Sequence, residues 1–292
     1  MIRGMETPSG LGLDEVGGGI ESVARALAGK LYQHPRRIRN HGIMRKKMAT
    51  SDTSHLSDYQ VDTPLMMHND HAFISEGACG FWQLLHIVNG SAKAKIVNAA
   101  SVAAELERVD PEAYRLLTEV PVTHALRTIH YDKNGEYTKD IGDCHEGVFE
   151  DEATHPILNM KKDAKGELFL DKVCHQEIKR GVCAIPFKKQ DAFMAAYRKW
   201  IHLCESEEFV SYVEWPENSL LVLNNDWVMH GRGIPQSETE RIMVWGYIQK
   251  HIADCNYRLL KQRELEAKGV DGRWSSRIPN PVLAQLVNLH HS

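Results

Sequence analysis

The chain of 292 residues has no long apolar run, no close cysteine pair and no large excess of one charge. Its apolar stretches, such as residues 192–197, are far shorter than the ~20 residues that span a bilayer, so we expect no membrane segment. The 21 Gly and 11 Pro follow no period, which excludes collagen-like and low-complexity chains. A net charge of -4 offers no general attraction for polyanions. The remaining class is a globular protein, in keeping with 42% hydrophobic and 25% charged residues.

The six cysteines are scattered, and none belongs to a C-x-x-C pair. This spacing argues against a zinc ribbon or a thioredoxin motif and favours free, mostly buried thiols. The first ten residues carry no apolar segment of the kind that a secretory signal needs, so a cytoplasmic location is the default expectation. A basic run at residues 34–47 lacks the interleaved aromatic residues of a stacking platform and is interpreted as a solvated face. We therefore expect a small-molecule substrate, no nucleic-acid or membrane partner, and a homodimer as one possible assembly.

Glycine is concentrated near the beginning of the chain, including three consecutive glycines at 17–19. We expect residues 1–20 to be flexible and residues 21–292 to form a single domain, since no shift of composition divides them. A helical pattern of apolar residues follows the glycines, between residues 20 and 31.

From about residue 60 the signals are mostly those of short strands. The predicted strands cover residues 81–88, 95–97, 121–131, 209–215, 220–223 and 241–249. Two predicted helices interrupt them, one beginning after Asp110 and one at 192–203 with Asp191 as its cap, and a last helix covers about 253–268. Many short strands, few helices and no βαβ alternation favour a mainly β core with flanking helices (α+β), of barrel or jelly-roll type.

His68 and Asp70 end an apolar strand near the start of these signals. Residues i and i+2 of an extended chain point to one face, so both side chains can reach a single ion. The spacing alone is a weak signal, because His175 and Glu177 share it. His230 follows another apolar strand near the far end of the chain. Two imidazoles and one carboxylate leave three positions open on an ion, an arrangement typical of non-haem Fe(II) oxygenases, where a co-substrate and O₂ bind.

Arg241 lies eleven residues after His230 and opens the next predicted strand. Its planar guanidinium is suited to bind a carboxylate with two parallel hydrogen bonds, as the far end of a chelating keto-acid would require. Strand alternation places Trp245 and Tyr247 on the same face as Arg241, where they line either a co-substrate pocket or the core.

Five motifs occur in a fixed order between about residues 55 and 260. They are His68-Asn69-Asp70; Gln83-Leu84-Leu85-His86; Asp110-Pro111-Glu112-Ala113-Tyr114; Asn224-Asn225 followed by His230-Gly231-Arg232; and Arg241 with Tyr247. This series resembles that of the Fe(II)/2-oxoglutarate dioxygenases of the taurine-dioxygenase-like superfamily, particularly the γ-butyrobetaine and trimethyllysine hydroxylase branch.

The resemblance implies a double-stranded β-helix of the jelly-roll, clavaminate synthase-like kind. It also implies that Fe(II) is held by His68, Asp70 and His230, and that Arg241 binds 2-oxoglutarate. In that family, O₂ and 2-oxoglutarate are converted with release of succinate and CO₂, and the usual outcome is hydroxylation of the substrate.

The residues expected to contact the substrate depart from the betaine hydroxylases, which surround a trimethylammonium group with an aromatic cage. One cage Tyr directly follows their metal-ligand Asp, and His71 occupies that place here. Tyr59 lies one residue from the place of another cage Tyr, and Phe73 is a further candidate. Arg232 is a fourth, which orients either a substrate carboxylate or the region of Asp226, with ordinary packing as the alternative. These departures disfavour a trimethylammonium substrate and leave a small amino-acid-like or amine metabolite.

Other polar residues are interpreted as structural. His86 is expected in the core or behind the ligands, and His175 and Glu177 at a solvated strand end. The acidic residues 140–152 are expected to form an exposed loop, with a lid over the site as a hypothesis.

The sequence thus predicts an Fe(II)/2-oxoglutarate oxygenase that hydroxylates a small metabolite. A biosynthetic oxidase of the same cofactor class, giving desaturation, cyclisation or C–N bond formation on an amino-acid-derived natural product, is the first alternative. A zinc hydrolase and a non-catalytic metal-binding module are alternatives from other classes.

Overall fold

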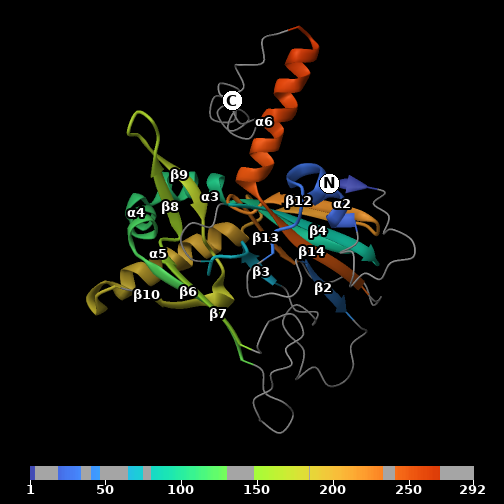
Figure 1. Cartoon of the computed structure of the whole chain (residues 1–292). Helices are drawn as coiled ribbons and strands as arrows, with labels where there is room; N and C mark the ends of the chain where they lie inside the picture. The colour runs from blue at the N-terminus through green and yellow to red at the C-terminus, as the bar shows by residue number, and fades with distance from the viewer. Residues whose placement is uncertain are drawn as a thin grey trace.

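The structure is a computed structural model that describes residues 1–3, 19–33, 41–46, 65–74, 80–129, 148–183, 185–232 and 241–269. Two antiparallel sheets form its centre (Figure 1). The five-stranded sheet has the order β1 (Ile2–Arg3), β12 (Ser219–Asn224), β4 (Phe81–Asn89), β14 (Arg241–Gln249) and β2 (His41–Lys46). The four-stranded sheet has the order β11 (Ser211–Trp215), β5 (Ala92–Asn98), β13 (Val228–Arg232) and β3 (Leu65–His68).

Apolar side chains of both sheets pack together, so the sheets face each other. Leu85, Leu221 and Trp245 of the five-stranded sheet share one cluster with Ala94 and Trp215 of the four-stranded sheet. Alternation along each strand sends one set of side chains between the sheets and the other set to the outer face. The predicted double-stranded β-helix with flanking helices is confirmed.

Helices cover both outer faces (Figure 1). Helix α2 (Gly19–Ala28) packs on the five-stranded sheet, where Ile20 contacts the cluster of Leu84 and Val244. The other face is covered by α3 (Ala99–Val109), α4 (Pro111–Glu119) and α5 (Phe187–Glu205), which enclose Met67 and Met229. Helix α6 (Lys250–Ala267) continues from β14 and extends away from the sheets.

The described residues between 122 and 183, which lie in the chain between β5 and β11, form further strands outside the two central sheets. A three-stranded sheet has the order β10 (Arg180–Cys183), β6 (Val122–Ile129) and β7 (Val148–His155), and β8 (Leu158–Lys162) pairs with β9 (Leu168–Val173). The 3₁₀ helix η2 (Glu177–Lys179) precedes β10. No helix within the described ranges is long and apolar enough to cross a bilayer.

The predicted strands are found close to their expected positions, and the helix after Asp110 is confirmed, because the Asp110 carboxylate accepts a hydrogen bond from the amide of Ala113 at 3.0 Å. The cap assigned to Asp191 is wrong. Helix α5 begins four residues earlier, at Phe187 directly after Pro186. Helix α3 was not predicted, although the Asn98 side chain caps it by accepting a hydrogen bond from Ala100 at 3.0 Å.

Three other predictions have partial outcomes. The acidic residues 140–152 are not all loop, because residues 148–152 belong to β7, and the rest lie outside the described residues. Residues 41–46 of the basic run form β2. Ile2 and Arg3 pair with β12, so these two residues of the predicted flexible segment are in a strand. Cys174 and Cys204 are buried free thiols, as expected, whereas Cys255 is exposed.

A buried histidine makes the stability of this fold dependent on pH. His124 is fully buried and stacks on His155 with ring centroids 5.2 Å apart. Burial, with the charge of His155 second, lowers the pKa of His124 to about 3. An unfolded His titrates near about 6.5, so the unfolded chain binds the extra proton between these values. His124 therefore contributes stability that is present above about pH 6.5 and is lost as the pH falls.

We predict that His124→Phe, which keeps a planar ring, flattens the pH dependence of unfolding. As the pH falls from about 7 to about 5, the equilibrium constant for unfolding should rise more steeply in the parent than in the variant. The difference should approach about tenfold per pH unit. Denaturant titrations at both pH values measure this difference. If the unfolding constants of parent and variant changed equally with pH, a buried neutral imidazole at this position would be contradicted.

Candidate metal centre

The two histidines of the predicted site lie opposite each other on neighbouring strands. Strand β13 pairs with β3 in antiparallel register, and His230 is the partner of His68. Directly opposed residues of such a pair point to the same face, and the ring centroids are 4.5 Å apart. Residues 162 positions apart in the chain are thus brought together by backbone pairing alone.

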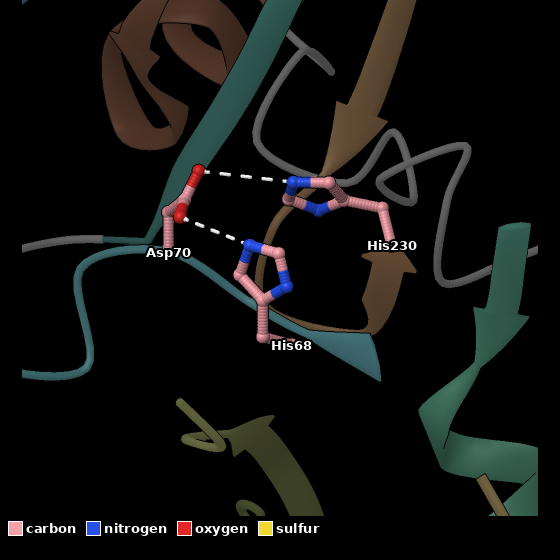
Figure 2. A group of neighbouring side chains, drawn as sticks. All are labelled: His68, Asp70 and His230. Atoms are coloured by element: carbon pink, nitrogen blue, oxygen red, sulfur yellow. Dashed lines mark ion pairs between the residues drawn. The ribbon is translucent and has the colours of Figure 1, made fainter. Parts of the chain in front are cut away.

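Asp70 completes the group from the turn after β3 (Figure 2). The Nε2 atom of His68 lies 3.6 Å from Asp70 Oδ1, and the Nε2 atom of His230 lies 3.9 Å from Asp70 Oδ2. All three potential ligand atoms are within 4.8 Å of one another. Atoms this close can share one ion, and two imidazoles with one carboxylate are the donor set of the facial triad of non-haem Fe(II) enzymes. The residues present therefore fit Fe(II).

Hydrogen bonding and burial prepare both imidazoles to bind a metal. His68 Nδ1 lies 2.8 Å from the carbonyl oxygen of Met66, which accepts its proton and leaves the Nε2 lone pair facing Asp70. Burial, with the charge of His68 second, lowers the pKa of His230 to about 4. The low pKa of His230 favours its neutral ring, which is the form that coordinates a metal.

Two asparagines fix the turn that carries Asp70. The amide of Asp70 donates to Asn225 Oδ1 at 2.9 Å, and Asn225 Nδ2 donates to the carbonyl of Asp70 at 2.7 Å. Asn69 is held against the segment after β9 by two hydrogen bonds. Its backbone N–H donates to the carbonyl of His175 at 2.9 Å, and its side-chain Oδ1 accepts from the backbone N–H of His175 at 2.6 Å. The second Asn of the Asn224-Asn225 motif thus acts on the backbone of the carboxylate ligand.

The carboxylate of Asp70 is oriented by side chains from three elements. Its Oδ2 accepts hydrogen bonds from Gln83 Nε2 at 2.5 Å and from the Tyr247 hydroxyl at 2.8 Å, whereas Oδ1 accepts a longer one from Gln176 Nε2 at 3.4 Å. Burial acts to raise the pKa of Asp70, but the neighbouring imidazoles of His230 and His68 and the hydrogen bond from Tyr247 hold it below its ordinary value. The carboxylate is ionised at neutral pH, and its Oδ1 atom accepts fewer and longer hydrogen bonds than Oδ2.

A partly buried ion pair holds β3, which is an edge strand, in place. Glu205, at the end of α5, accepts the amide proton of Met67 at 2.6 Å through Oε1 and pairs with Lys95 Nζ at 2.5 Å through Oε2. Lys95 is buried on β5. An edge strand has one row of unpaired amides, so this contact supplies a partner that the sheet does not.

The other predicted site residues have different surroundings. Arg241 and Arg232 are buried, on β14 and β13. Trp245 packs between the sheets, whereas Val244 faces α2, so side chains alternate along this part of β14. Tyr59 lies outside the described residues. The roles of Arg241, Arg232 and Tyr59 stay predictions.

His71 and Phe73 belong to an aromatic group beside Asp70. The His71 ring lies 3.9 Å from that of Tyr247, 5.0 Å from that of Phe81 and 5.8 Å from that of Phe73, all between centroids. The backbone of His71 is left-handed, with φ of 66°. Its ring is packed among these aromatic rings.

His175 and Glu177 have a structural role, as expected, but the prediction that His175 lies at a solvated strand end is wrong. His175 is buried, and burial lowers its pKa to about 4. Its Nδ1 lies 3.1 Å from the Tyr197 hydroxyl, which donates to Glu177 at 2.5 Å, and Arg180 binds Glu177 through two nitrogens. This network anchors the segment that carries Gln176 against α5. His86 is in the core, as expected, where its Nδ1 accepts the amide proton of Gly19 at 3.3 Å.

A family model described as taurine catabolism dioxygenase TauD, TfdA family, matches residues 12–247. The chain belongs to this family, and it is a 2-oxoglutarate-dependent non-haem iron oxygenase. No curated protein sequence matches it.

Solved structures with a similar chain include PvcB of Pseudomonas aeruginosa, at 14% identity and a TM-score of 0.47 over 78% of this chain and 70% of that one. The non-haem iron oxygenase OrfP, in complex with Fe, succinate and (3S)-hydroxy-L-Arg, has 12% identity and a TM-score of 0.48 over 78% of this chain and 66% of that one. An asparagine oxygenase has 11% identity and a TM-score of 0.44 over 70% and 56%.

Gly231 allows β13 and β3, the strands that carry the two histidine ligands, to approach closely. We therefore predict that Gly231→Ala weakens iron binding. A Cβ atom at residue 231 would lie 2.6 Å from the carbonyl oxygen of Leu65, which is backbone of β3. The strands must separate, and the two imidazoles with them. Anaerobic Fe(II) titration should show affinity lower by about tenfold or more.

The matched control is Gly181→Ala, in β10, where the new Cβ would meet its nearest atom at 3.4 Å. This variant should bind Fe(II) as the parent does. Equal iron affinity in both alanine variants would refute the role of Gly231.

The Tyr247 hydroxyl is expected to orient Asp70 for the metal. Tyr247→Phe removes only the oxygen that donates to Asp70 Oδ2, and we predict a loss of about tenfold in Fe(II) affinity, the lower end of the range for such supporting contacts. Tyr114→Phe removes a hydroxyl that contacts Met160, away from Asp70, and should leave iron affinity unchanged. The same small effect in both variants would show that the Asp70 contact is dispensable.

Proposed function

We propose that the protein hydroxylates an unactivated C–H bond of a small amino-acid-like or amine metabolite, with Fe(II), 2-oxoglutarate and O₂. The observation that carries the proposal is the convergence of His68, Asp70 and His230, with three ligand atoms within 4.8 Å and no fourth His, Cys, Asp or Glu in that group among the described residues. Three ligands from one side leave room for a chelating co-substrate and for O₂.

Fe(II) at this centre, with 2-oxoglutarate and O₂, supplies an oxidant that converts R–H to R–OH while 2-oxoglutarate becomes succinate and CO₂. The residues of the chain bind and orient. His68 presents its Nε2 atom, because its Nδ1 donates to Met66, and His230 presents a neutral ring. Asp70 presents an ionised carboxylate whose direction is set by Gln83 and Tyr247. Arg241 is proposed to bind the distal carboxylate of 2-oxoglutarate through its guanidinium.

The alternatives are separated by what is consumed. A zinc hydrolase would act without 2-oxoglutarate and O₂, and a metal-binding module would bind without turnover. Desaturation, cyclisation or C–N bond formation would consume the same co-substrates and give a different product. A screen for substrate-stimulated succinate release over amino acids and amines, with product analysis, identifies the outcome.

The direct test is an anaerobic titration of the protein with Fe(II) and 2-oxoglutarate. The proposal predicts the visible charge-transfer band of the iron chelate at one equivalent of each. Iron binding without this band, at saturating 2-oxoglutarate, would contradict the proposed function.

We predict that Arg241→Ala raises the concentration of 2-oxoglutarate needed for half-maximal band intensity by about tenfold or more, because a charged hydrogen-bonded pair is lost. Iron affinity should change little, since Arg241 is not one of the three ligands. Arg108→Ala, which removes an exposed guanidinium paired with Glu105 on α3, is the control and should match the parent. Unchanged 2-oxoglutarate binding in Arg241→Ala would refute its assignment.

A further inference from the structure

Two buried glutamine side chains flank Asp70 and share an unusual feature. Gln83 and Gln176 are 1% and 3% exposed. Each uses its Nε2 atom to donate to the Asp70 carboxylate. Neither Oε1 atom has a hydrogen-bond partner among the residues that the structure describes. Two strong acceptors are therefore buried beside the metal ligands without a donor.

The orientation of both amides follows from the charge of Asp70. An ionised carboxylate only accepts hydrogen bonds, so each amide must turn its NH₂ group toward it. The reversed amide would place oxygen against oxygen. Since the Oε1 and Nε2 atoms of an amide are bonded to one carbon, both free acceptors lie close to the carboxylate, Gln83 on the side of Oδ2 and Gln176 on the side of Oδ1.

Both side chains are held firmly, so their acceptors cannot simply turn away. Gln83 lies on β4 as the cross-strand partner of Tyr247. Gln176 follows His175, whose backbone is tied by two hydrogen bonds to Asn69. Leaving a buried acceptor unsatisfied costs about 1–3 kcal/mol, and such groups in native proteins ordinarily have a partner. A bound molecule that donates from nitrogen would satisfy both.

The chemistry of the acceptors selects among nitrogen groups. A primary ammonium has three N–H donors and a positive charge that the adjacent Asp70 attracts, whereas a trimethylammonium has no N–H to donate. The aromatic rings beside Asp70 pack against His71, with centroid distances of 3.9 Å for Tyr247 and 5.0 Å for Phe81, so they are not free to surround a methylated cation. Both observations favour an unmethylated nitrogen.

We propose that the carbonyl oxygens of Gln83 and Gln176 bind an unmethylated ammonium group of the substrate beside the metal centre. This assignment rests on the proposed function, because it places the amine of the substrate next to the site of oxidation. It makes the two glutamines residues that select primary amines over their quaternary analogues.

The first experiment measures binding to the anaerobic protein loaded with Fe(II) and 2-oxoglutarate. The probes are L-lysine, L-arginine, L-asparagine and 4-aminobutyrate. Each is compared with its trimethylated form, which carries the methyl groups on the α-amine of the three amino acids and on the single amine of 4-aminobutyrate. Calorimetry and the shift of the charge-transfer band report binding. At least one primary amine should bind about tenfold or more tightly than its trimethylated form. Equal or tighter binding of the trimethylated form, or no binding of any primary amine, would overturn the inference.

The second experiment uses Gln176→Met, a side chain of similar length without the acceptor. Amine affinity is measured at concentrations of Fe(II) and 2-oxoglutarate that saturate the iron chelate band of the variant, and it should fall about tenfold or more. Gln262→Met, on the surface of α6, is the control and should bind the amine as the parent does. Unchanged amine affinity in Gln176→Met would overturn the inference.

The two proposals fail in distinguishable ways. Absence of the charge-transfer band in the parent protein contradicts the proposed function, whereas an intact band with no preference for unmethylated amines contradicts only the role of the glutamines. The comparison of methylated and unmethylated probes uses the parent protein, so it stands even where a glutamine variant fails to fold.

Discussion

The pairing of β3 with β13 is the constraint on which the metal centre depends. It places His68 directly opposite His230, and the turn after β3 then brings Asp70 within 4 Å of both rings. The pairing itself needs a residue without a side chain at position 231, where any Cβ would meet the backbone of Leu65. It also needs a partner for the free edge of β3, which α5 supplies through Glu205 and the buried Lys95.

Around this pair, residues from distant parts of the chain act on one carboxylate. Asn225 binds the backbone of Asp70, whereas Gln83, Gln176 and Tyr247 bind its oxygens. Hydrogen bonds from supporting residues set the direction of a metal ligand and tune its basicity. Three polar residues of the ordered motifs are explained by this convergence, because Gln83, Asn225 and Tyr247 contact Asp70 rather than the metal position. The same network leaves two acceptors unused, which is why it also bears on the substrate.

Much of this arrangement could be predicted from local pattern. The alternation of β14, the Asp110 cap and the His68–Asp70 spacing are signals within a few residues, and the structure confirms them. The strand order and the pairing of His68 with His230 could not be derived from such signals, since backbone pairing between distant segments leaves no local mark. The order of the motifs indicated only that His68, Asp70 and His230 share one metal site.

The predictions that were wrong also relied on local signals alone. Asp191 satisfies the local rule for a cap, yet α5 begins at Phe187, in an exposed first turn that the apolar pattern does not mark. His175 is followed by charged residues that indicate a solvated segment, but Tyr197 and Asn69 bury it. Gln176 and the Lys95–Glu205 pair had no signal in the sequence, because their importance lies in contacts across more than 100 positions.

The central claim is that one ferrous ion is bound by both imidazoles of the β3–β13 pair, with its remaining positions open. X-ray absorption of the anaerobic Fe(II) protein tests this most directly, because imidazole rings give a distinct outer-shell scattering pattern. The account predicts two imidazoles per iron in the parent and one in His230→Ala. Iron bound without imidazole scattering, or with the same pattern in both proteins, would contradict it.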